Sequence, residues 1–331
     1  FKANAISTLR QDLQVPVWTP YWGLTYRYKE VVKLKLGMRA AVIPVENPVS
    51  FISPRSSAFL KLSEWISLKT SASINQQFFR PIELERQLGQ STSANVISAG
   101  RNIPVLRSAQ GTFGVQMKQS GFSLNGDLFL RRNTGILEQV LSVPGLSDID
   151  NEVFGNNTYE LFQGSNTVAG FDLTSSFEKK NFYGLLSYTY TKSEDSFPKL
   201  FNGQAIVDQN NRLNQLNFFT SYTYNSWSFA STYVYGSGIS TLDRSSLPSD
   251  VDRANFQPSD LFTQLPDYNR WDLSASYRLP TKLGDFHFDF SIINVLDYRN
   301  VNSEIDIYTV QGSNQNSLAA AQVELLGRVW T

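Results

Sequence analysis

The sequence predicts an all-β protein in which antiparallel strands form a barrel that crosses a membrane. Three features of the sequence favour this fold class. Apolar and polar side chains alternate strictly over many short segments, these segments are joined in pairs by turns of a few residues, and long polar connections separate the pairs. Alternation places the apolar side chains on one face of each strand. Short turns at one end and long loops at the other are typical of outer-membrane barrels.

The composition is consistent with such a barrel. Only 18% of the 331 residues are charged, whereas 13% are aromatic, and the usual charged share of soluble domains is about 25%. The 29 basic residues balance the 29 acidic ones, so we expect no nucleic-acid partner. No apolar run approaches the length of about 18 residues that a membrane helix requires. Without cysteine and with a single histidine, thiolate and multi-histidine metal sites are excluded, and we expect no cofactor.

The first pair of strands turns at Lys29 and Glu30. Its apolar face comprises Trp22, Leu24, Tyr26, Tyr28, Val32, Leu34, Leu36, Met38 and Ala40. The opposite face carries four basic side chains, which we expect to line an aqueous interior: Arg27, Lys33, Lys35 and Arg39.

Five further pairs follow in order. They lie at 54–64 with 65–79, at 113–119 with 122–131, at 171–179 with 182–190, at 216–224 with 227–235, and at 271–279 with 286–292. Single strands are expected at 2–12 and from Val323 onward, which makes about fourteen strands, each near the 9–11 residues that a tilted strand needs to cross a bilayer. The long connections are expected near 44–53, 80–106, 133–165, 194–212, 239–267 and 297–318. A soluble β-sandwich is the alternative, and it would bury the aromatic faces against one another.

Aromatic residues lie at both ends of the predicted strands. Trp65 and Trp227 stand beside short turns, and four tyrosines stand at the loop-proximal ends: Tyr188, Tyr190, Tyr233 and Tyr235. Amphipathic rings prefer the headgroup level of a membrane, so two aromatic belts are predicted at the membrane interfaces. The alternative is that these rings are ordinary core residues.

The polar faces offer little catalytic chemistry. His287, Asp289 and Ser291 share one face of one strand, but residues two apart on a strand are about 7 Å apart, which is too far for a catalytic triad. We therefore expect no enzyme activity. We expect instead that the polar residues of the inner face line the lumen of the barrel. Besides His287, Asp289 and the four basic residues above, these are Lys118, Asp127, Arg131 and Asp272.

Ligand recognition is predicted in the segment 133–165, because loops carry variable function on a fixed scaffold. The segment is acidic and contains Phe154, Tyr159 and Phe162, and Arg132 directly precedes it. These four residues are the candidate ligand-binding residues. An acidic, aromatic loop would suit a cationic or sugar-like ligand, and it would equally serve as a solvated lid. The basic inner residues would attract an anionic metal chelate.

Four segments resemble a known family. They are Gly184-Leu-Leu-Ser-Tyr-Thr-Tyr-Thr-Lys-Ser193, Tyr233-Val-Tyr-Gly-Ser-Gly238, Leu265-Pro-Asp-Tyr-Asn-Arg-Trp-Asp-Leu-Ser-Ala-Ser-Tyr277 and Ile293-Asn-Val-Leu-Asp-Tyr-Arg-Asn300. In order and spacing they are similar to the C-terminal barrel of TonB-dependent outer-membrane receptors, particularly those of Bacteroidetes-type bacteria. The resemblance implies that residues 1–331 form the C-terminal part of a barrel of about 22 strands. In this family the barrel encloses a plug domain, so the resemblance also implies that the polar residues of the inner face contact a plug and that the basic ones pair with its carboxylates. The start at Phe1 has no signal-peptide pattern, and neither a signal peptide nor a plug domain is expected within the chain.

The resemblance also implies a function and partners. The expected function is import of a scarce nutrient across the outer membrane of a Gram-negative bacterium. A siderophore or other metal chelate, cobalamin and an oligosaccharide all remain open as ligands. The expected partners are the TonB-ExbB-ExbD complex, outer-membrane lipid, the nutrient ligand and a surface lipoprotein. The alternatives are a passive porin and a surface-exposed adhesin, both without gated transport.

Overall fold

The computed structural model describes residues 2–3, 16–43, 49–85, 91–98, 103–142, 158–199, 203–208, 211–242, 262–311, 315–324 and 329–330. Among these residues, every regular element is a β-strand and the strands pair antiparallel. The prediction of an all-β, antiparallel fold is therefore confirmed. No helix in the described ranges is long and apolar enough to span a membrane.

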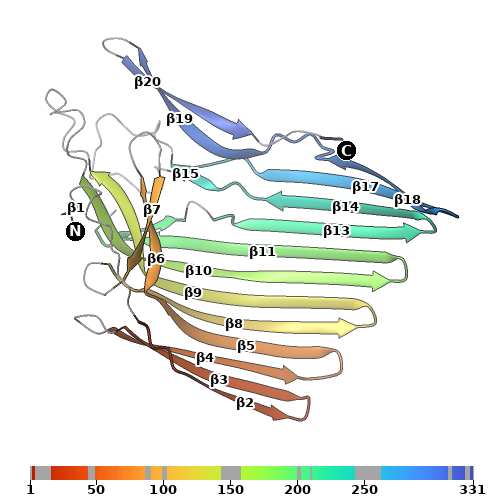
Figure 1. Cartoon of the computed structure of the whole chain (residues 1–331), viewed down its shortest axis with the longest axis horizontal. Coiled ribbons are helices and arrows are strands. Elements are labelled where there is room, and N and C mark those ends of the chain that lie inside the picture. Colours follow the sequence, from red (N-terminus) through yellow and green to blue (C-terminus); the bar gives the residue numbers. More distant parts are fainter. Residues whose placement is uncertain are drawn as a thin grey trace.

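One large sheet of 15 strands makes up most of the molecule (Figure 1). Neighbouring strands along its main path are β2 (Tyr21–Tyr28), β3 (Val32–Ile43), β4 (Val49–Lys61), β5 (Ile66–Gln77), β8 (Leu106–Gln119), β9 (Phe122–Ser142), β10 (Thr158–Lys179), β11 (Phe182–Ser196), β13 (Asn214–Tyr224), β14 (Trp227–Gly236), β17 (Tyr268–Thr281), β18 (Gly284–Ile293) and β21 (Val329–Trp330). Two short strands join this sheet at the side, β1 (Lys2–Ala3) on β10 and β12 (Ala205–Val207) on β11. All six predicted pairs of strands are present.

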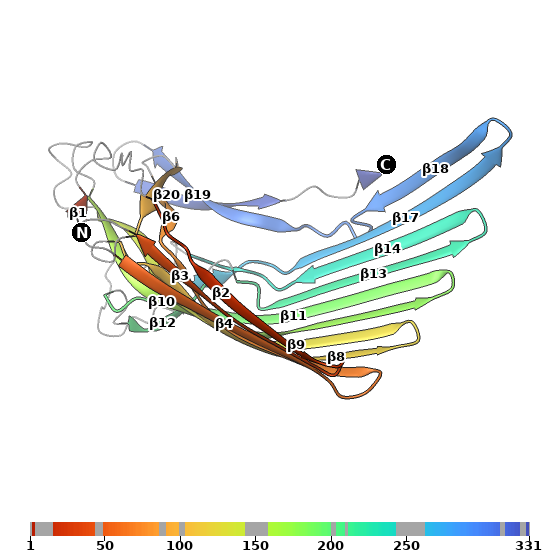
Figure 2. The same cartoon turned by 60° about the horizontal axis from the view of Figure 1, so that its bottom comes forward.

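Three small hairpins interrupt the long connections. They are β6 (Phe79–Glu85) with β7 (Ser91–Ile97), β15 (Ser240–Leu242) with β16 (Phe262–Gln264), and β19 (Val301–Gln311) with β20 (Gln315–Glu324). The hairpins lie toward the end of the sheet where the long connections are, and the short turns lie at the opposite end (Figures 1 and 2). The predicted asymmetry of short turns and long connections is thus present in space as well as in sequence.

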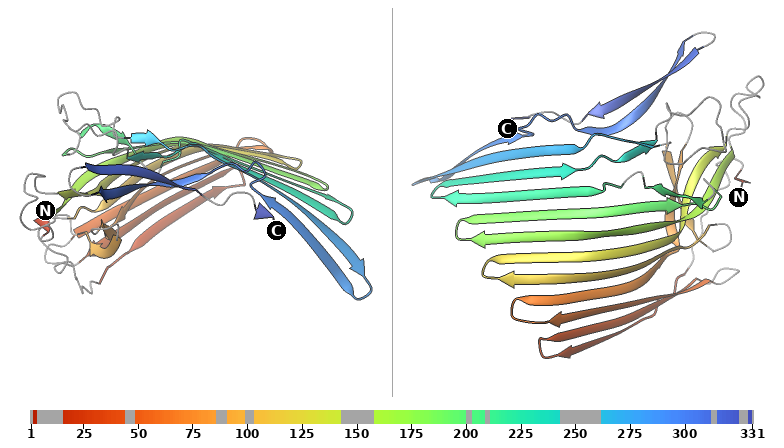
Figure 3. Two further views of the ribbon diagram at one scale, coloured as in Figure 1. Left: turned by 90° about the horizontal axis from the view of Figure 1, so that it is seen from above. Right: turned by 180° about the vertical axis from the view of Figure 1, so that it is seen from behind.

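The large sheet has two chemically different faces. Residues paired directly across neighbouring strands point to the same side, and one such row runs Phe182, Tyr222, Phe229, Ala275, Phe290. We call the side that carries this row the outward face. Its large apolar side chains are solvent-exposed, Leu128 and Leu130 to 58% each, and no second sheet covers it in the described part of the chain. The structure therefore differs from the β-sandwich alternative, and the sheet curves like part of a cylinder wall (Figure 3).

The short turns explain why the strand pairs close where they do. Ser120 and Gly121 link β8 to β9, and both have positive φ angles, 40° and 82°. Positive φ at both central residues is the requirement of a type I′ turn, whose twist matches that of the flanking strands. Lys29, Lys180 and Asn225 also have positive φ in the corresponding turns.

Three sequence predictions of boundaries are corrected. The predicted loop 133–165 is mostly strand, because β9 and β10 stay paired up to Ser142 and Thr158. Val323 lies in β20 of a separate hairpin, and the strand that follows β18 in the large sheet is β21, from Val329. Of the predicted strand 2–12, only Lys2 and Ala3 are described, and they add to the edge of β10. In the last part of β9 apolar residues come in adjacent pairs, Ile136 with Leu137 and Val140 with Leu141, so alternation no longer distinguishes a strand from a loop.

Candidate functional site

The candidate site is the polar face of the large sheet, on the side opposite the outward face. By strand register, all ten residues predicted to face the interior lie on it: Arg27, Lys33, Lys35, Arg39, Lys118, Asp127, Arg131, Asp272, His287 and Asp289. Seven of these ten residues are exposed, and Lys33, Asp127 and Asp272 are half-buried. Because membrane barrels turn polar side chains to the lumen and apolar side chains to lipid, we assign the polar face to the inside of the curved sheet.

One part of this face is strongly basic. We define the basic wall as six side chains of β2 to β5: Arg27, Lys33, Lys35, Arg39, Arg55 and Lys69. Lys33 pairs across to Phe59 and Phe59 to Lys69, so these three residues form one row. A groove of about 530 Å³ runs along the wall, lined by Lys33, Lys35, Phe59, Lys69 and Asp127 together with serine and threonine residues. Only Lys69 of the six has an acidic partner within the described residues. The wall can therefore attract an anion.

The partner of Lys69 lies two strands away. Its Nζ is 2.8 Å from Asp127 Oδ2 and 3.1 Å from Asn125 Oδ1. Gly114 of β8 stands between the two strands, paired with Lys69 on one side and Asp127 on the other. A Cβ at Gly114 would lie 2.1 Å from Asp127 Oδ1 and 2.6 Å from Lys69 Cε. The missing side chain of Gly114 thus leaves the space in which the ion pair forms.

A second polar cluster lies where β9, β10 and β11 extend toward the long connections. Buried Asn166 accepts a hydrogen bond from Asn133 at 3.0 Å and donates to Ser193 at 2.8 Å and Asp195 at 2.7 Å. Ser193 Oγ donates to Asp208 Oδ2 at 3.0 Å. Burial raises the pKa of the Asp195 carboxyl, the Asn166 hydrogen bond lowers it, and the neighbouring Asp208 charge raises it, with a net upward shift. The cluster holds β10, β11 and the short β12 segment together.

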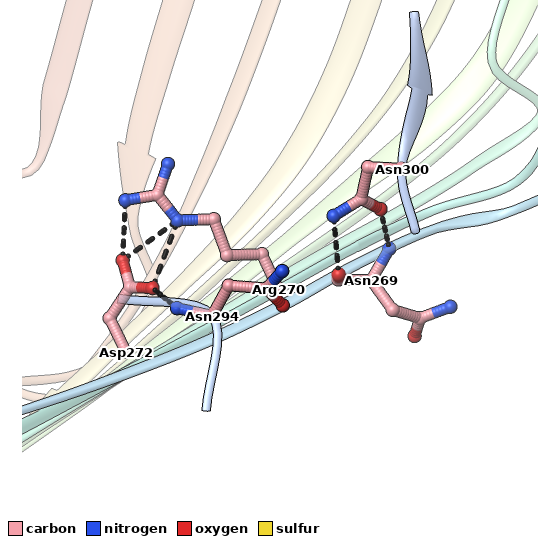
Figure 4. A network of polar contacts seen from close by, with 5 residues as sticks. All are labelled: Asn269, Arg270, Asp272, Asn294 and Asn300. Atoms are coloured by element: carbon pink, nitrogen blue, oxygen red, sulfur yellow. Dashed lines mark hydrogen bonds and ion pairs between the residues drawn. The ribbon is translucent and has the colours of Figure 1, made fainter. Parts of the chain in front are cut away.

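A third polar cluster joins β17 to residues that follow β18 (Figure 4). The Arg270 guanidinium lies 2.7 Å from Asp272 Oδ2, and the backbone N–H of Asn294 donates to Asp272 Oδ1 at 2.9 Å. The side chain of Asn300 accepts from the backbone N–H of Asn269 and donates to its carbonyl, each at 2.8 Å. β18 ends at Ile293. The Asn300 side chain thus makes the two hydrogen bonds to Asn269 of β17 that a neighbouring strand would otherwise make.

Of the residues considered for catalysis, Asp289 and His287 each lie against a different residue of β17. Asp289 accepts a hydrogen bond from Ser276 on β17, and His287 lies opposite Arg278, which pairs with Asp285. Within the described ranges, no three His, Cys, Asp or Glu side chains gather to hold a metal ion. That the protein is not an enzyme stays a prediction.

Five of the six predicted belt aromatics lie on the outward face near the ends of the strands, and Trp65 lies in the short turn before β5. Trp227 is next to a short turn, and both tryptophans are 44% exposed. At the other end, tyrosine hydroxyls donate to polar partners near the long connections: Tyr188 to Asn214 at 2.7 Å, Tyr233 to Asn269 at 2.9 Å and Tyr235 to Asp267 at 2.9 Å. Tyr190 stacks on Phe171 with ring centroids 5.8 Å apart. These arrangements combine an apolar ring with a polar tip, as residues at a membrane interface do.

The candidate ligand-binding residues are not gathered in one loop. Phe154 lies outside the described residues. Tyr159 and Phe162 lie in β10, and Arg132 lies in β9 on the outward face, in line with Leu128 and Leu130. The prediction placed them in a single loop because the extension of the two strands was not recognised.

Several side chains of the three polar clusters were missed by the sequence reasoning. Lys69, Asn166 and Asn300 are the main ones. Alternation with the apolar Ile66 and Leu68 would have placed Lys69 on the polar face. No sequence signal identifies the partners of Asn166 and Asn300, because those contacts depend on strand register.

Comparisons with known proteins bear on this arrangement. A family model described as "TonB dependent receptor-like, beta-barrel" matches residues 11–295. No curated protein matches the chain in sequence.

Three similar solved structures share the fold. The copper transporter OprC is 12% identical over 95% of this chain and 48% of its own length, with a TM-score of 0.61. The FrpB iron transporter from Neisseria meningitidis is 12% identical over 96% and 45%, with a TM-score of 0.60. The ferripyoverdine receptor of the outer membrane of Pseudomonas aeruginosa is 14% identical over 86% and 35%, with a TM-score of 0.57. The chain thus spans about half or less of the length of these structures.

Proposed function

The chain belongs to the family of TonB-dependent receptor β-barrels, and we propose that the complete protein is an outer-membrane receptor of a Gram-negative bacterium. It binds a scarce nutrient from the extracellular side and imports it with energy transmitted by TonB. The observation that supports this most is the two-faced sheet: an exposed apolar outward face that suits lipid, and a polar face with a basic groove that suits a solute.

A metal chelate is the ligand class that the similar structures favour. One is a copper transporter, one an iron transporter, and one a receptor bound to ferripyoverdine. The basic wall would attract an anionic chelate, because its Lys33 and Lys35 have no acidic partner among the described residues. Cobalamin and an oligosaccharide remain further candidates. The proposed partners are TonB-ExbB-ExbD, outer-membrane lipid, the ligand and a surface lipoprotein.

An uptake assay tests the proposal. Cells with and without the gene, in backgrounds with and without functional TonB, would be given radiolabelled iron as ferric citrate, copper(II), cyanocobalamin and a maltooligosaccharide in turn. Uptake of one of them that needs both the gene and TonB supports the proposal. Gene-dependent uptake that persists without TonB indicates a passive porin. Gene-dependent attachment of cells to a surface, with none of the four taken up, indicates an adhesin.

A further inference from the structure

Two arginines stand out on the largely apolar outward face. Arg132 of β9 follows Leu128 and Leu130 in the outward row, and it pairs across to Ala109 of β8. Arg107 lies two residues from Ala109 on β8, so it points to the same side. Both side chains are exposed. The register of this pair of strands is regular from Arg107 to Gln119, so no bulge turns either side chain inward.

The spacing of the two arginines suits one shared anion. Residues diagonally opposed on neighbouring strands lie about 7–8 Å apart at the backbone. Long arginine side chains cover that distance from both sides, and their planar forks match the oxygens of a phosphate.

The height of the pair on the sheet matches the headgroup level. Arg132 is the eleventh residue of β9, counted from Phe122 at the short turn, and a tilted strand crosses the hydrocarbon in about 9–11 residues. The exposed Leu130 lies directly below Arg132, and the stacked Phe171 and Tyr190 lie further down the same face. The arginines therefore lie where hydrocarbon gives way to charged headgroups, on the side of the long connections.

Neither arginine has a partner in the described part of the chain. The nearest outward-facing ion pair is formed by Lys192 and Glu194 on β11, 2.8 Å apart, and it carries no net charge. β10 separates that pair from Arg132, with Thr167 between Arg132 and Glu194. Two exposed positive charges thus remain next to a surface that suits lipid.

We propose that Arg107 and Arg132 form a clamp on the outer wall of the barrel that binds a phosphate group of an outer-leaflet glycolipid. The occupant follows from charge complementarity and from position, since a phosphorylated lipid places anions at this height and a solute bound inside the barrel does not. The proposal rests on the membrane orientation of the barrel, and it is independent of which nutrient the receptor imports.

Native mass spectrometry of the complete, detergent-purified protein tests the clamp. The protein would be titrated with bis-phosphorylated lipid A and with the same lipid lacking phosphates. The variant Arg107→Gln with Arg132→Gln should bind the phosphorylated lipid about thirtyfold more weakly, since each basic side chain near an anionic surface contributes about a factor of five. The variant Arg107→Lys with Arg132→Lys keeps both charges and should lose less. Lys33→Gln with Lys35→Gln, on the polar face, is the matched control and should bind as the wild type does.

Three results would overturn the clamp. One is equal binding of the phosphorylated lipid by the wild type and the glutamine variant. Another is equal binding of the phosphorylated and the phosphate-free lipid by the wild type. This comparison needs no variant, so it tests the clamp even if the glutamine variant does not fold. The last is complete displacement of the lipid by an equal concentration of inorganic phosphate, which would make the pair a site for the free ion.

Discussion

At the scale of single residues, Gly114 controls whether Lys69 and Asp127 can meet. We expect Gly114→Ala to separate the ion pair, because the new Cβ would occupy the place of the Asp127 and Lys69 side-chain ends. Both charges are partly exposed, 37% and 26%, so the cost should be small, about 0.5–1 kcal/mol of unfolding free energy. Urea unfolding of the barrel in lipid vesicles, followed by tryptophan fluorescence, measures it.

Two glycines provide the comparison for Gly114. A Cβ at Gly111 would meet only the Ser71 carbonyl oxygen at 3.9 Å, so Gly111→Ala should be neutral. A Cβ at Gly170 would lie 2.1 Å from the backbone oxygen of Tyr190, so Gly170→Ala should cost about 2 kcal/mol or more. In a Lys69→Met background, Gly114→Ala should cost nothing further, because the pair is already absent. Full additivity there would contradict the role given to Gly114.

Asp195 makes stability depend on pH. Its pKa in the folded protein is raised above 3.8 by burial and by the Asp208 charge, so the folded state binds the proton more tightly than the unfolded state does. The unfolding free energy therefore falls as the pH rises from 3.8 toward the folded pKa. In the Asp195→Asn variant, the side-chain oxygen still accepts the hydrogen bond from Asn166, and the side chain carries no charge. We expect it to stabilise the protein at neutral pH and to have no such effect below 3.8. Unfolding curves at several pH values check this, and a gain that is constant with pH would contradict it.

At the scale of elements, the end of β17 depends on one side chain from outside the sheet. Asn300 is 3% exposed and bonds both backbone groups of Asn269. Asn300→Leu would leave the partly buried N–H and carbonyl of Asn269 without these partners, and we expect a loss of about 2 kcal/mol. Asn300→Asp keeps the acceptor for the N–H, so its loss should be smaller. Hydrogen exchange at the Asn269 amide measures the effect locally, and equal protection in both variants would count against this role.

The elements were predictable from sequence where two signals coincide. All six strand pairs were found because alternation of apolar side chains ended at a short turn, as at Ser120 and Gly121. Where one signal is missing, the prediction failed. Beyond Arg132 the alternation in β9 is lost, because Ile136 and Leu137, and then Val140 and Leu141, form adjacent apolar pairs, so the pattern predicts a loop where the strand continues. The contacts of Asn166 and Asn300 could not be predicted either, because they join residues whose proximity is set by register alone.

At the scale of the whole molecule, charge is divided unevenly over the polar face. β2 to β5 carry the basic wall, whereas Asp272, Asp285 and Asp289 lie on β17 and β18. The chain has no cysteine, so Ser57→Cys introduces a single thiol into it at the groove, and any cysteine elsewhere in the complete protein would be replaced by serine. In the complete protein, an anionic methanethiosulfonate should react there several-fold faster than a cationic one, and Lys33→Gln with Lys35→Gln should remove the preference.

Ser228→Cys, beside the Ser276 and Asp289 pair, is the control and should not favour the anion. A cationic preference at Ser57→Cys would mean that carboxylates of another domain cover the wall.

The assignment of the two faces makes a second prediction for the whole molecule, because adjacent residues on one strand should differ sharply in their tolerance of charge. Val115 of β8 pairs with outward-facing Leu68, and Gln116 pairs with Ser67 on the polar face. Val115 is the fifth residue from the end of β8 at the short turn, near the middle of the membrane. Val115→Arg should therefore cost about 2–4 kcal/mol, and Gln116→Arg should be close to neutral, since its side chain is exposed on the polar side.

Unfolding in lipid vesicles and the yield of folded protein in outer membranes measure the difference between the two arginine variants. Both variants introduce arginine one residue apart on the same strand. Strand propensity and net charge are therefore matched, and only the face of the sheet differs. A large loss at Val115 alone means that the outward face contacts hydrocarbon. Equal tolerance at both positions would show that water bathes both faces, which would contradict the membrane assignment. Equal loss at both would mean that the polar face is packed against a covering domain at this height, which would move the solute path away from β8.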